Sequence, residues 1–288
     1  MNVFKTGLLL SILTVLLVFI GQLLGGTTGA MTAFIVALAI NLISYWFSDK
    51  IVLAMYRAQP LNESDAPQVY RAVREIASRE HMPVPKVYWI ATQTPNAFAT
   101  GRSPSHAAVA VTSGLLELMN EEELKGVLAH ELSHVKNRDT LVMTVAAALA
   151  GAIMMLARMA QWGLWMGGGR SRDEENRGAA VTQLVVILLI AILAPLAAML
   201  IQLAISRTRE YGADATGAHL TGNPSGLASA LEKLDRATRA YPLPNANPAT
   251  AHLFIVNPLS AGAIANLFST HPPIAERIRR LRSMRLTT

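Results

Sequence analysis

Five residues near the middle of the chain combine side chains that can bind a metal ion with one that can activate water. They read His130-Glu131-Leu132-Ser133-His134, an H-E-x-x-H pattern. On an α-helix, His130 and His134 project from one face one turn apart, so both imidazoles can reach a single ion. A zinc ion held by two imidazoles and a third protein ligand keeps one position open for water, and Glu131 could take that water's proton. The pattern therefore predicts the chemistry of a metallopeptidase.

The sequence around this motif predicts the helix that the chemistry requires. Asn120, followed by glutamates at 121–123, is typical of a capping box at a helix start. An apolar stripe then recurs at helical spacing. It consists of Leu124, Val127, Leu128, Leu132 and Val135. The alternative is a surface helix that carries two histidines and a glutamate by chance, and a motif well inside an amphipathic helix argues against it.

A metal site built on H-E-x-x-H needs one more protein ligand. Because the chain has no cysteine, only His, Asp or Glu can supply it. Glu210 and Asp214 lie four residues apart on a predicted helix, so one carboxylate could bind the metal while the other orients a ligand histidine. Spacing alone also allows a surface helix whose arginines pair with its acids. In that case His219 is the next candidate ligand.

The composition is that of a membrane protein. Hydrophobic residues make up 52% of the 288 residues and charged residues 15%, whereas ordinary soluble domains are about a quarter charged. The net charge of +6 is not accompanied by basic residues interleaved with aromatic ones or by a recognition motif. We therefore expect a lipid bilayer, and no nucleic acid, as a partner.

Apolar segments divide the chain into four regions. Residues 1–47 predict a transmembrane hairpin, made of uncharged runs at 7–24 and 30–47 that are long enough to span a hydrocarbon core. Residues 140–205 predict a second pair of apolar helices around a polar loop at 167–178. The alternative for the first run is a cleaved signal peptide, but such signals usually have apolar runs of only ~7 to 15 residues.

The two remaining regions, 48–139 and 206–288, are soluble in composition and predict two halves of one catalytic domain. His130, His134 and Glu210 must meet on one side of the membrane, so an even number of crossings separates them. Each half contains ten Lys or Arg, and the turn between the first two apolar runs contains none. The positive-inside rule therefore places both halves in the cytoplasm.

Short runs in the first half predict a small antiparallel sheet beside the motif helix. The expected strands are 86–90, 96–100 and 107–112. An edge strand of this sheet could pair with an extended peptide substrate, although a plain core sheet is equally consistent with the pattern. Because the apolar run 141–156 follows the motif directly, one long helix could continue from the motif into the membrane.

Several stretches together resemble the HtpX-type membrane zinc metalloproteases, relatives of the CAAX prenyl endopeptidases. They are HELSHVKNRD (130–139), SRTREYGAD (206–214), NAFATG (96–101), FSTHPP (268–273) and the apolar N-terminal hairpin. The resemblance covers essentially the whole chain. It implies an α+β protein, mainly helical and integral to the membrane, with about four apolar helices and a cytoplasmic gluzincin-like domain. It also implies that Glu210 is the third Zn²⁺ ligand and that Asp214 does not bind the metal itself but orients one of its ligands.

The same resemblance implies a multi-pass endopeptidase of the bacterial inner membrane that degrades misfolded or damaged membrane proteins in a stress-linked quality-control role. Two alternatives remain: a dedicated processing protease for one substrate class, and a non-catalytic zinc-dependent membrane scaffold. Retention of Glu131 weighs against the scaffold. The sequence motifs do not indicate an oligomeric state.

His271 is a further candidate for the site. Peptide hydrolysis develops negative charge on the carbonyl oxygen, so a hydrogen-bond donor besides the metal should assist. The related prenyl endopeptidases also carry a histidine before paired prolines near the active site. The alternative is that His271 fixes the C-terminal helix through a loop hydrogen bond. We expect His81, His106, His219 and His252 to be structural or surface residues.

Overall fold

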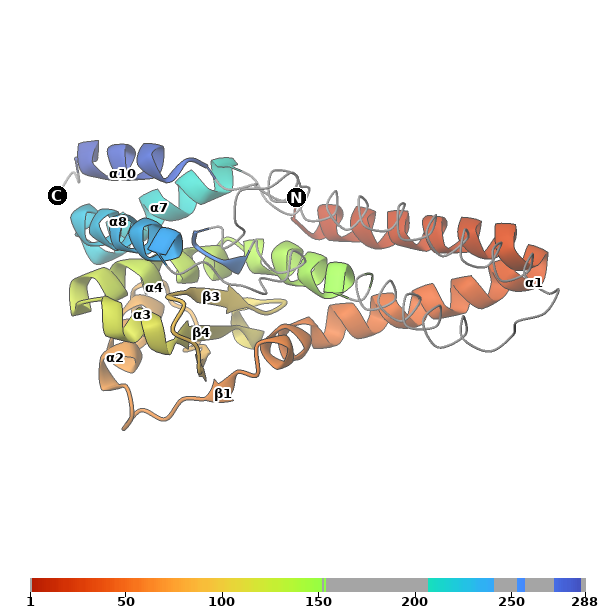
Figure 1. Cartoon of the computed structure of the whole chain (residues 1–288), viewed down its shortest axis with the longest axis horizontal. Coiled ribbons are helices and arrows are strands. Elements are labelled where there is room, and N and C mark those ends of the chain that lie inside the picture. Colours follow the sequence, from red (N-terminus) through yellow and green to blue (C-terminus); the bar gives the residue numbers. More distant parts are fainter. Residues whose placement is uncertain (1, 152, 154–206, 241–252, 257–271, 286–288) are drawn as a thin grey trace, which may run out of the picture.

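The N-terminal region is a helical hairpin. The computed structural model describes residues 2–151, 153, 207–240, 253–256 and 272–285, and Figure 1 shows the hairpin extending away from the sheet and the helices next to it. Helix α1 (Asn2–Met55) consists of two arms that meet at a kink, where Gly25 and Gly26 leave helical geometry. Gly26 has φ +58°, a conformation that glycine adopts without steric cost.

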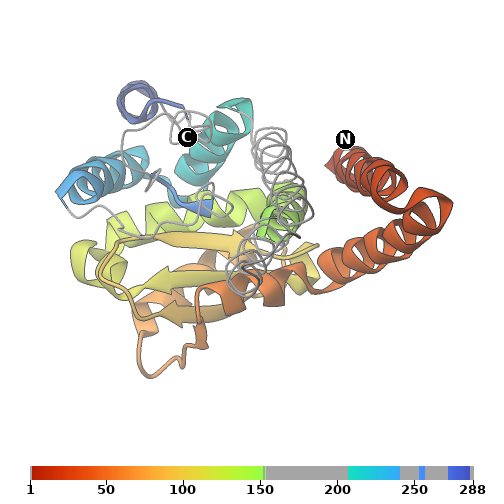
Figure 2. The ribbon, with the colours of Figure 1, turned by 45° about the vertical axis from the view of Figure 1, so that its right-hand side comes forward.

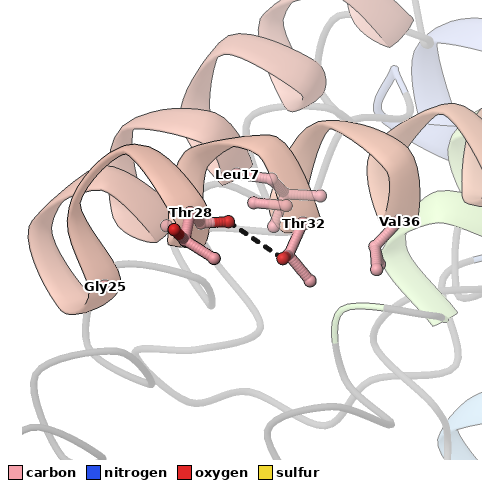
Figure 3. A pocket seen from close by; sticks show the side chains of 8 residues that line it. Leu17, Gly25, Thr28, Thr32 and Val36 are labelled. Carbon is pink, nitrogen blue, oxygen red and sulfur yellow. Dashed lines mark hydrogen bonds between the residues drawn. The ribbon is translucent and has the colours of Figure 1, made fainter.

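The two arms of α1 are joined by polar contacts and by close backbone approach. Asn41 Nδ2 donates to Leu10 O at 3.2 Å and to Thr14 Oγ1 at 2.8 Å, which links the arms across the hairpin. Near the kink, a Cβ on Gly21 would lie only 2.5 Å from Gly29 O. An open groove in this region is shown in Figure 3. Its lining consists of Leu17, Gly21, Gly25, Thr28, Gly29, Thr32, Ala33 and Val36. Small side chains of this kind allow close helix packing in a bilayer.

Within the described residues, one helix is long and apolar enough to cross a membrane, judged by length and composition: the second arm, Gly25–Met55. Thr6–Phe19 and Asp139–Gly151 are shorter apolar helices. The predicted polar loop at 167–178 and most of the predicted second pair of apolar helices lie outside the described residues. The expected count of four apolar helices therefore stays a prediction.

The domain beyond the hairpin contains a four-stranded mixed sheet. Its strands are β1 (Gln59–Pro60), β2 (Lys86–Ile90), β3 (Ala97–Thr100) and β4 (Ala108–Thr112), in the spatial order β1-β2-β4-β3. The expectation of an antiparallel sheet is wrong for the central pair, because β2 and β4 run parallel. After β2 the chain crosses to the far side to form β3, and β4 then returns between the two. Strand β4 is buried at every position, as a central strand should be.

The helices of the domain are arranged around α4, which itself packs against β3 (Figures 1 and 2). They are α2 (Pro67–Arg79), η1 (Pro104–His106), α3 (Ser113–Leu118), α4 (Glu121–Lys136), α7 (Arg207–Thr221), α8 (Pro224–Ala240) and α10 (Ile274–Ser283). Helix α4 contacts α2, β3, α7 and α8. Its inner face joins a cluster of buried residues that includes Val127, Leu128 and Leu132. The helix that carries the motif is thus fixed from several sides.

Both ends of α4 are defined by local chemistry. The predicted capping box is confirmed: the Asn120 side chain accepts from Glu123 N, and the Glu123 side chain accepts from Asn120 N. The helix ends at Lys136, and Arg138 adopts a left-handed φ of +57° before a new helix begins at Asp139. The expectation of one continuous helix from the motif into the apolar run is therefore wrong.

Candidate active site

Three motif side chains on α4 are buried in the domain. His130, Glu131 and His134 are 2%, 6% and 3% exposed. Helix α7 crosses α4 closely because it carries glycine at the crossing point: a Cβ on Gly217 would lie 3.0 Å from His130 N. This close crossing brings Glu210, near the start of α7, against the two histidines.

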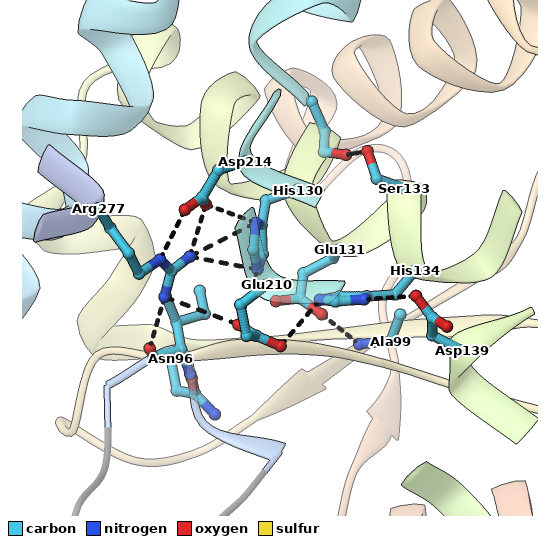
Figure 4. Close-up of polar contacts among 12 residues, drawn as sticks. Asn96, Ala99, His130, Glu131, Ser133, His134, Asp139, Glu210, Asp214 and Arg277 are labelled. Atoms are coloured by element: carbon cyan, nitrogen blue, oxygen red, sulfur yellow. Dashed lines mark hydrogen bonds and ion pairs between the residues drawn. The ribbon is translucent and has the colours of Figure 1, made fainter. Parts of the chain in front are cut away.

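The Nε2 atoms of both motif histidines face Glu210 (Figure 4). His130 Nε2 lies 3.7 Å from Glu210 Oε2, and His134 Nε2 lies 3.5 Å from Glu210 Oε1. One ligand atom from each of the three residues falls within 4.8 Å of the others. The structure therefore brings together the three residues that the sequence suggested as metal ligands.

The opposite ring nitrogen of each histidine meets an aspartate. His130 Nδ1 lies 3.0 Å from Asp214 Oδ1, and His134 Nδ1 lies 3.4 Å from Asp139 Oδ2. An aspartate that accepts a hydrogen bond from Nδ1–H fixes the tautomer whose Nε2 carries a lone pair. Both histidines thus present Nε2 to the same point in space.

Each of these aspartates in turn contacts an arginine. Arg277, fully buried on α10, donates from Nε to Asp214 Oδ2 at 2.8 Å and from Nη2 to Oδ1 at 2.7 Å. Arg209 Nε lies 3.5 Å from Asp139 Oδ1. Each motif histidine is therefore backed by an aspartate, which is in turn paired with an arginine.

Arg277 also contacts the His130 ring directly. Its Nη2 is 3.5 Å from Nδ1 and 3.4 Å from Nε2, so the guanidinium lies against the face of the ring. The Asp214 oxygen is closer to Nδ1 than this, and we therefore assign the Nδ1 proton to the hydrogen bond with Asp214. Arg277 Nη1 donates to Ile255 O at 3.3 Å and lies 3.8 Å from Glu210 Oε2.

Glu131 lies between the motif histidines and the edge of the sheet. Its Oε2 accepts a hydrogen bond from Ala99 N of β3 at 2.9 Å. Burial raises the pKa of the Glu131 carboxyl above its usual value, although both histidines and the Ala99 N–H act in the opposite direction. A raised pKa makes this carboxylate a better proton acceptor near neutral pH.

The surrounding charges set the pKa values of the other buried groups. Burial would lower the pKa of His134, but the hydrogen bond to Asp139 and the charge of Glu210 outweigh it and raise the pKa to about 8. For Asp214, burial would raise the pKa, yet Arg277 and His130 hold it well below its usual range. Asp214 therefore stays ionised wherever the protein is folded near neutral pH.

This arrangement fits a divalent metal ion. Two imidazole nitrogens and one carboxylate are a donor set that zinc accepts. A tetrahedral site with bonds of 2.0–2.1 Å needs neighbouring ligand atoms about 3.4 Å apart, and the two Nε2-to-carboxylate distances are 3.7 and 3.5 Å. Both distances from the Glu210 carboxylate are thus close to the tetrahedral value, and each ring has an aspartate at its Nδ1 atom.

The other histidines of the sequence take no part in this cluster where the structure describes them. His81, His106 and His219 are exposed. His219 lies at the C-terminal end of α7, away from the buried face that carries Glu210 and Asp214. The structure gives His219 no position as a ligand. His252 and His271 lie outside the described residues.

Sequence reasoning missed three residues near the site: Asn96, Asp139 and Arg277. Arg277 had a recognisable signal, since it shares one helix face with the apolar residues Ile274, Ile278 and Leu281. A charge on an apolar face predicts a buried partner. Asp139 closes the HELSHVKNRD stretch but becomes a partner of His134 only because of the break after α4. Asn96 Oδ1 accepts from Ile255 N at 3.1 Å, a contact between segments far apart in sequence.

An H-E-x-x-H helix, a crossing helix that adds a glutamate, and a sheet edge beside the motif glutamate define a metallopeptidase. The chain belongs to Peptidase family M48, whose family pattern matches residues 63–285. It is therefore a metalloendopeptidase, a hydrolase that acts on peptide bonds.

Similarity to known proteins extends over nearly the whole chain. The protein named Protease HtpX homolog from Syntrophobacter fumaroxidans is 62% identical over 281 residues, which cover 98% of this chain and 99% of the relative. A protein of the same name from Thermococcus sibiricus is 57% identical over 282 residues, or 97% of this chain and 95% of the relative. These relatives confirm the resemblance to HtpX-type proteases. The crystal structure of S. mikatae Ste24p is 18% identical, with a TM-score of 0.49, covering 87% of this chain and 57% of that one.

Proposed function

We propose that this protein is a zinc-dependent endopeptidase of the bacterial inner membrane that cleaves misfolded or damaged membrane proteins, with its catalytic domain in the cytoplasm. The observation that carries the proposal is the convergence of two Nε2 atoms and a carboxylate beside Glu131. Zinc is the metal that best suits this donor set in a cysteine-free protein.

In this proposal His130, His134 and Glu210 hold the metal, and Asp214 and Asp139 orient the two rings. When bound, zinc would polarise the scissile carbonyl and make a water molecule more acidic. The chain's own contribution is to bury the ligands and to hold each imidazole in the correct tautomer. Because the rings are fixed by partners, little side-chain freedom is lost when a metal enters.

Glu131 carries the proton in the reaction. Its carboxylate takes a proton from the attacking water and afterwards gives it to the leaving amine. The hydrogen bond from Ala99 N to Oε2 holds the side chain in place. Its pKa, raised by burial, brings the group closer to the range in which it can both accept and release a proton at neutral pH.

The edge strand β3 is the proposed binding site for the substrate backbone. Ala99 N points out of the sheet toward Glu131, and strand geometry places the N–H and C=O of Ala97 on the same edge, which pairs with no other strand among the described residues. An extended peptide that adds to this edge would run past Glu131. Main-chain recognition of this kind tolerates many sequences, as a protease for damaged proteins requires.

The membrane location is supported by the second arm of α1. Gly25–Met55 is long and apolar enough to cross a membrane, and residues such as Ile35 and Leu42 expose more than half of their surface. The basic residues of both soluble halves favour a cytoplasmic domain. The role in stress-linked quality control rests on the similarity to HtpX-type proteases.

The test is the activity of the purified protein in detergent on casein, with zinc content measured in parallel. We expect Glu131→Gln to retain zinc and to lose proteolysis, because the glutamate contacts water rather than the metal. Glu121→Gln is a matched control, exposed in the first turn of the same helix. If Glu131→Gln cleaved casein at the wild-type rate, the proposed mechanism would be wrong.

A further inference from the structure

Strand β3 connects the site to the membrane arm. It carries Ala99, which contacts Glu131, and it leads directly into a loop that begins at Gly101. The next residue, Arg102, reaches the second arm of α1. The strand proposed to bind substrate thus contacts the catalytic glutamate at Ala99, and three residues later the chain contacts the second arm of α1.

The contact between Arg102 and α1 combines two interactions. The Arg102 guanidinium lies over the Trp46 ring, 4.7 Å from its centroid, and Nη1 donates to Trp46 O at 3.2 Å. A stacked guanidinium that also hydrogen-bonds a backbone carbonyl has a fixed position. We call this pair the Trp46–Arg102 anchor.

The surroundings of the anchor have the chemistry of a membrane surface. Trp46 is 51% exposed and Phe47 47% exposed, and Lys50 Nζ lies 5.4 Å from the centroid of the Phe47 ring. Exposed aromatic rings next to basic side chains, at the end of an apolar span, are typical of the headgroup region. About two turns after Trp46, Val52 and Leu53 are buried in the domain. The bilayer surface therefore crosses α1 near Trp46.

The path from the anchor to the site is rigid. Gly101 has φ +127°, and a Cβ there would clash with His106 O, so only glycine fits. Thr144 Oγ1 accepts from Gly101 N at 3.3 Å and from Thr100 Oγ1 at 3.1 Å. The Phe98 ring packs against Tyr56 at a centroid distance of 5.3 Å. Strand β3 is therefore held at a fixed height above the membrane.

We infer that the protease cleaves peptide bonds a few residues outside the bilayer, in segments that emerge from the membrane and add to β3. This inference rests on the proposed function and narrows its substrate class to the juxtamembrane parts of membrane proteins. The occupant of the anchor's exposed face is the headgroup layer, because that face is continuous with the spanning arm of α1.

The length of chain between β3 and the anchor limits the distance between the scissile bond and the bilayer. Ala99 and Arg102 are three residues apart, which limits their separation to about 10 Å. The headgroup layer adds about 5–7 Å between the anchor and the hydrocarbon core. A substrate paired with β3 therefore places its scissile bond within roughly six residues of its last membrane-embedded residue.

The experiment uses the full chain in vesicles of phosphatidylethanolamine and phosphatidylglycerol, together with a substrate that has one transmembrane helix and an extended tail. A segment known to be cleaved in casein is placed about 4, 12 or 24 residues beyond the helix, and the product ends are identified by mass spectrometry. We expect the nearest segment to be cleaved about tenfold faster than the farthest, because effective concentration falls with tether length. If the site lay far from the bilayer, the nearest segment would resist cleavage, and that result would overturn the inference.

Variants of the Trp46–Arg102 anchor test whether the anchor causes the preference for cleavage near the bilayer. We expect Arg102→Ala and Trp46→Ala each to slow cleavage of the nearest tethered segment about fivefold, which is the loss of one cation–π contact, and to leave casein cleavage unchanged. Arg74→Ala is the matched control, because Arg74 also stacks on an aromatic ring, Tyr70, but on α2. If both anchor variants behaved like Arg74→Ala, the anchor would have no such role.

Failure of the inference can be told from failure of the proposed function. A wild-type protein that cleaves casein in a Glu131-dependent way, but cleaves all tethered segments equally, would overturn only the inference. A wild-type protein no more active on casein than Glu131→Gln would overturn the proposed function, and the inference with it.

Discussion

His134 Nδ1 lies 3.4 Å from Asp139 Oδ2, although the two residues belong to different helices. On an unbroken helix, a residue five positions later would be rotated by about 140° and could not face the same ring nitrogen. The left-handed residue Arg138 turns the chain so that Asp139 points back at His134. The break after α4 therefore belongs to the construction of the site.

Removal of the Asp139 carboxylate should weaken metal binding without abolishing it. We expect Asp139→Ala to lower zinc affinity by roughly ten- to a hundredfold, the usual effect of a group that orients a ligand histidine. Asp214→Ala should have an effect of the same order. Zinc titration against a competing chelator measures both, with the exposed Asp65→Ala as control. Wild-type affinity in Asp139→Ala would show that His134 does not need this partner.

Glu210 should be indispensable for the metal. We expect Glu210→Ala to contain no zinc after purification, because only two protein ligands remain. The matched control is His219→Ala on the same helix, which should keep zinc and activity because His219 is exposed away from the cluster. Equal zinc content in wild type and Glu210→Ala would move the third-ligand assignment to another residue.

Local features of the fold were predictable from the sequence. The observed strand at 86–90 and the N-cap of α4 at Asn120 agree with the prediction. They were predictable because a strand pattern and a capping box are each encoded within a few neighbouring residues. That Glu210 and Asp214 share a helix follows from the same kind of local pattern.

Features that depend on distant contacts were not predictable. Strand β4 lies between β2 and β3, and this order makes β2 and β4 parallel where an antiparallel pair was expected. The residues of a strand do not reveal which strands lie beside it. Arginine is not a residue type that favours a left-handed φ, so the sequence did not indicate the turn at Arg138. The position of Arg277 on an apolar helix face indicated that it is buried, but its partner Asp214 is 63 residues away in sequence and could not be identified from that pattern.

His271, which lies outside the described residues, stays the proposed donor to the developing oxyanion. It directly precedes Pro272 and Pro273, which lead into α10 and so toward Arg277. We expect His271→Ala to lower kcat about a hundredfold while zinc content and thermal stability stay near wild type. Lost stability with near-normal kcat per folded molecule would instead assign His271 a structural role.

The metal-free protein should lose stability as pH rises. The pKa of His134 is raised from 6.5 to about 8 in the folded state, so its contribution is complete below 6.5 and is lost as pH rises through 8. The difference corresponds to about 2 kcal/mol of unfolding free energy. Denaturant unfolding with chelator present, at about pH 6 and pH 9, measures it. His134→Gln should lack this dependence, and an equal dependence in that variant would assign the effect to another group.

Arg277 should matter both for stability and for the metal. It is fully buried and paired with Asp214, so Arg277→Met leaves a buried carboxylate without its counter-charge, which costs about 3–5 kcal/mol. Without the guanidinium, the pKa of Asp214 rises toward protonation, and a protonated Asp214 holds His130 less firmly in the metal-binding tautomer. Zinc affinity should therefore fall as well.

A double variant separates the two effects. In Arg277→Met with Asp214→Leu, both charges are replaced by apolar groups, so we expect most of the lost stability to return. Zinc affinity should stay low, because His130 Nδ1 still lacks its acceptor. The control is Arg280→Met on the same helix, where Arg280 is exposed and lies over the Tyr211 ring. If zinc affinity recovered together with stability in the double variant, Arg277 and Asp214 would serve only to hold α10 against α7, and His130 would be oriented by some other contact.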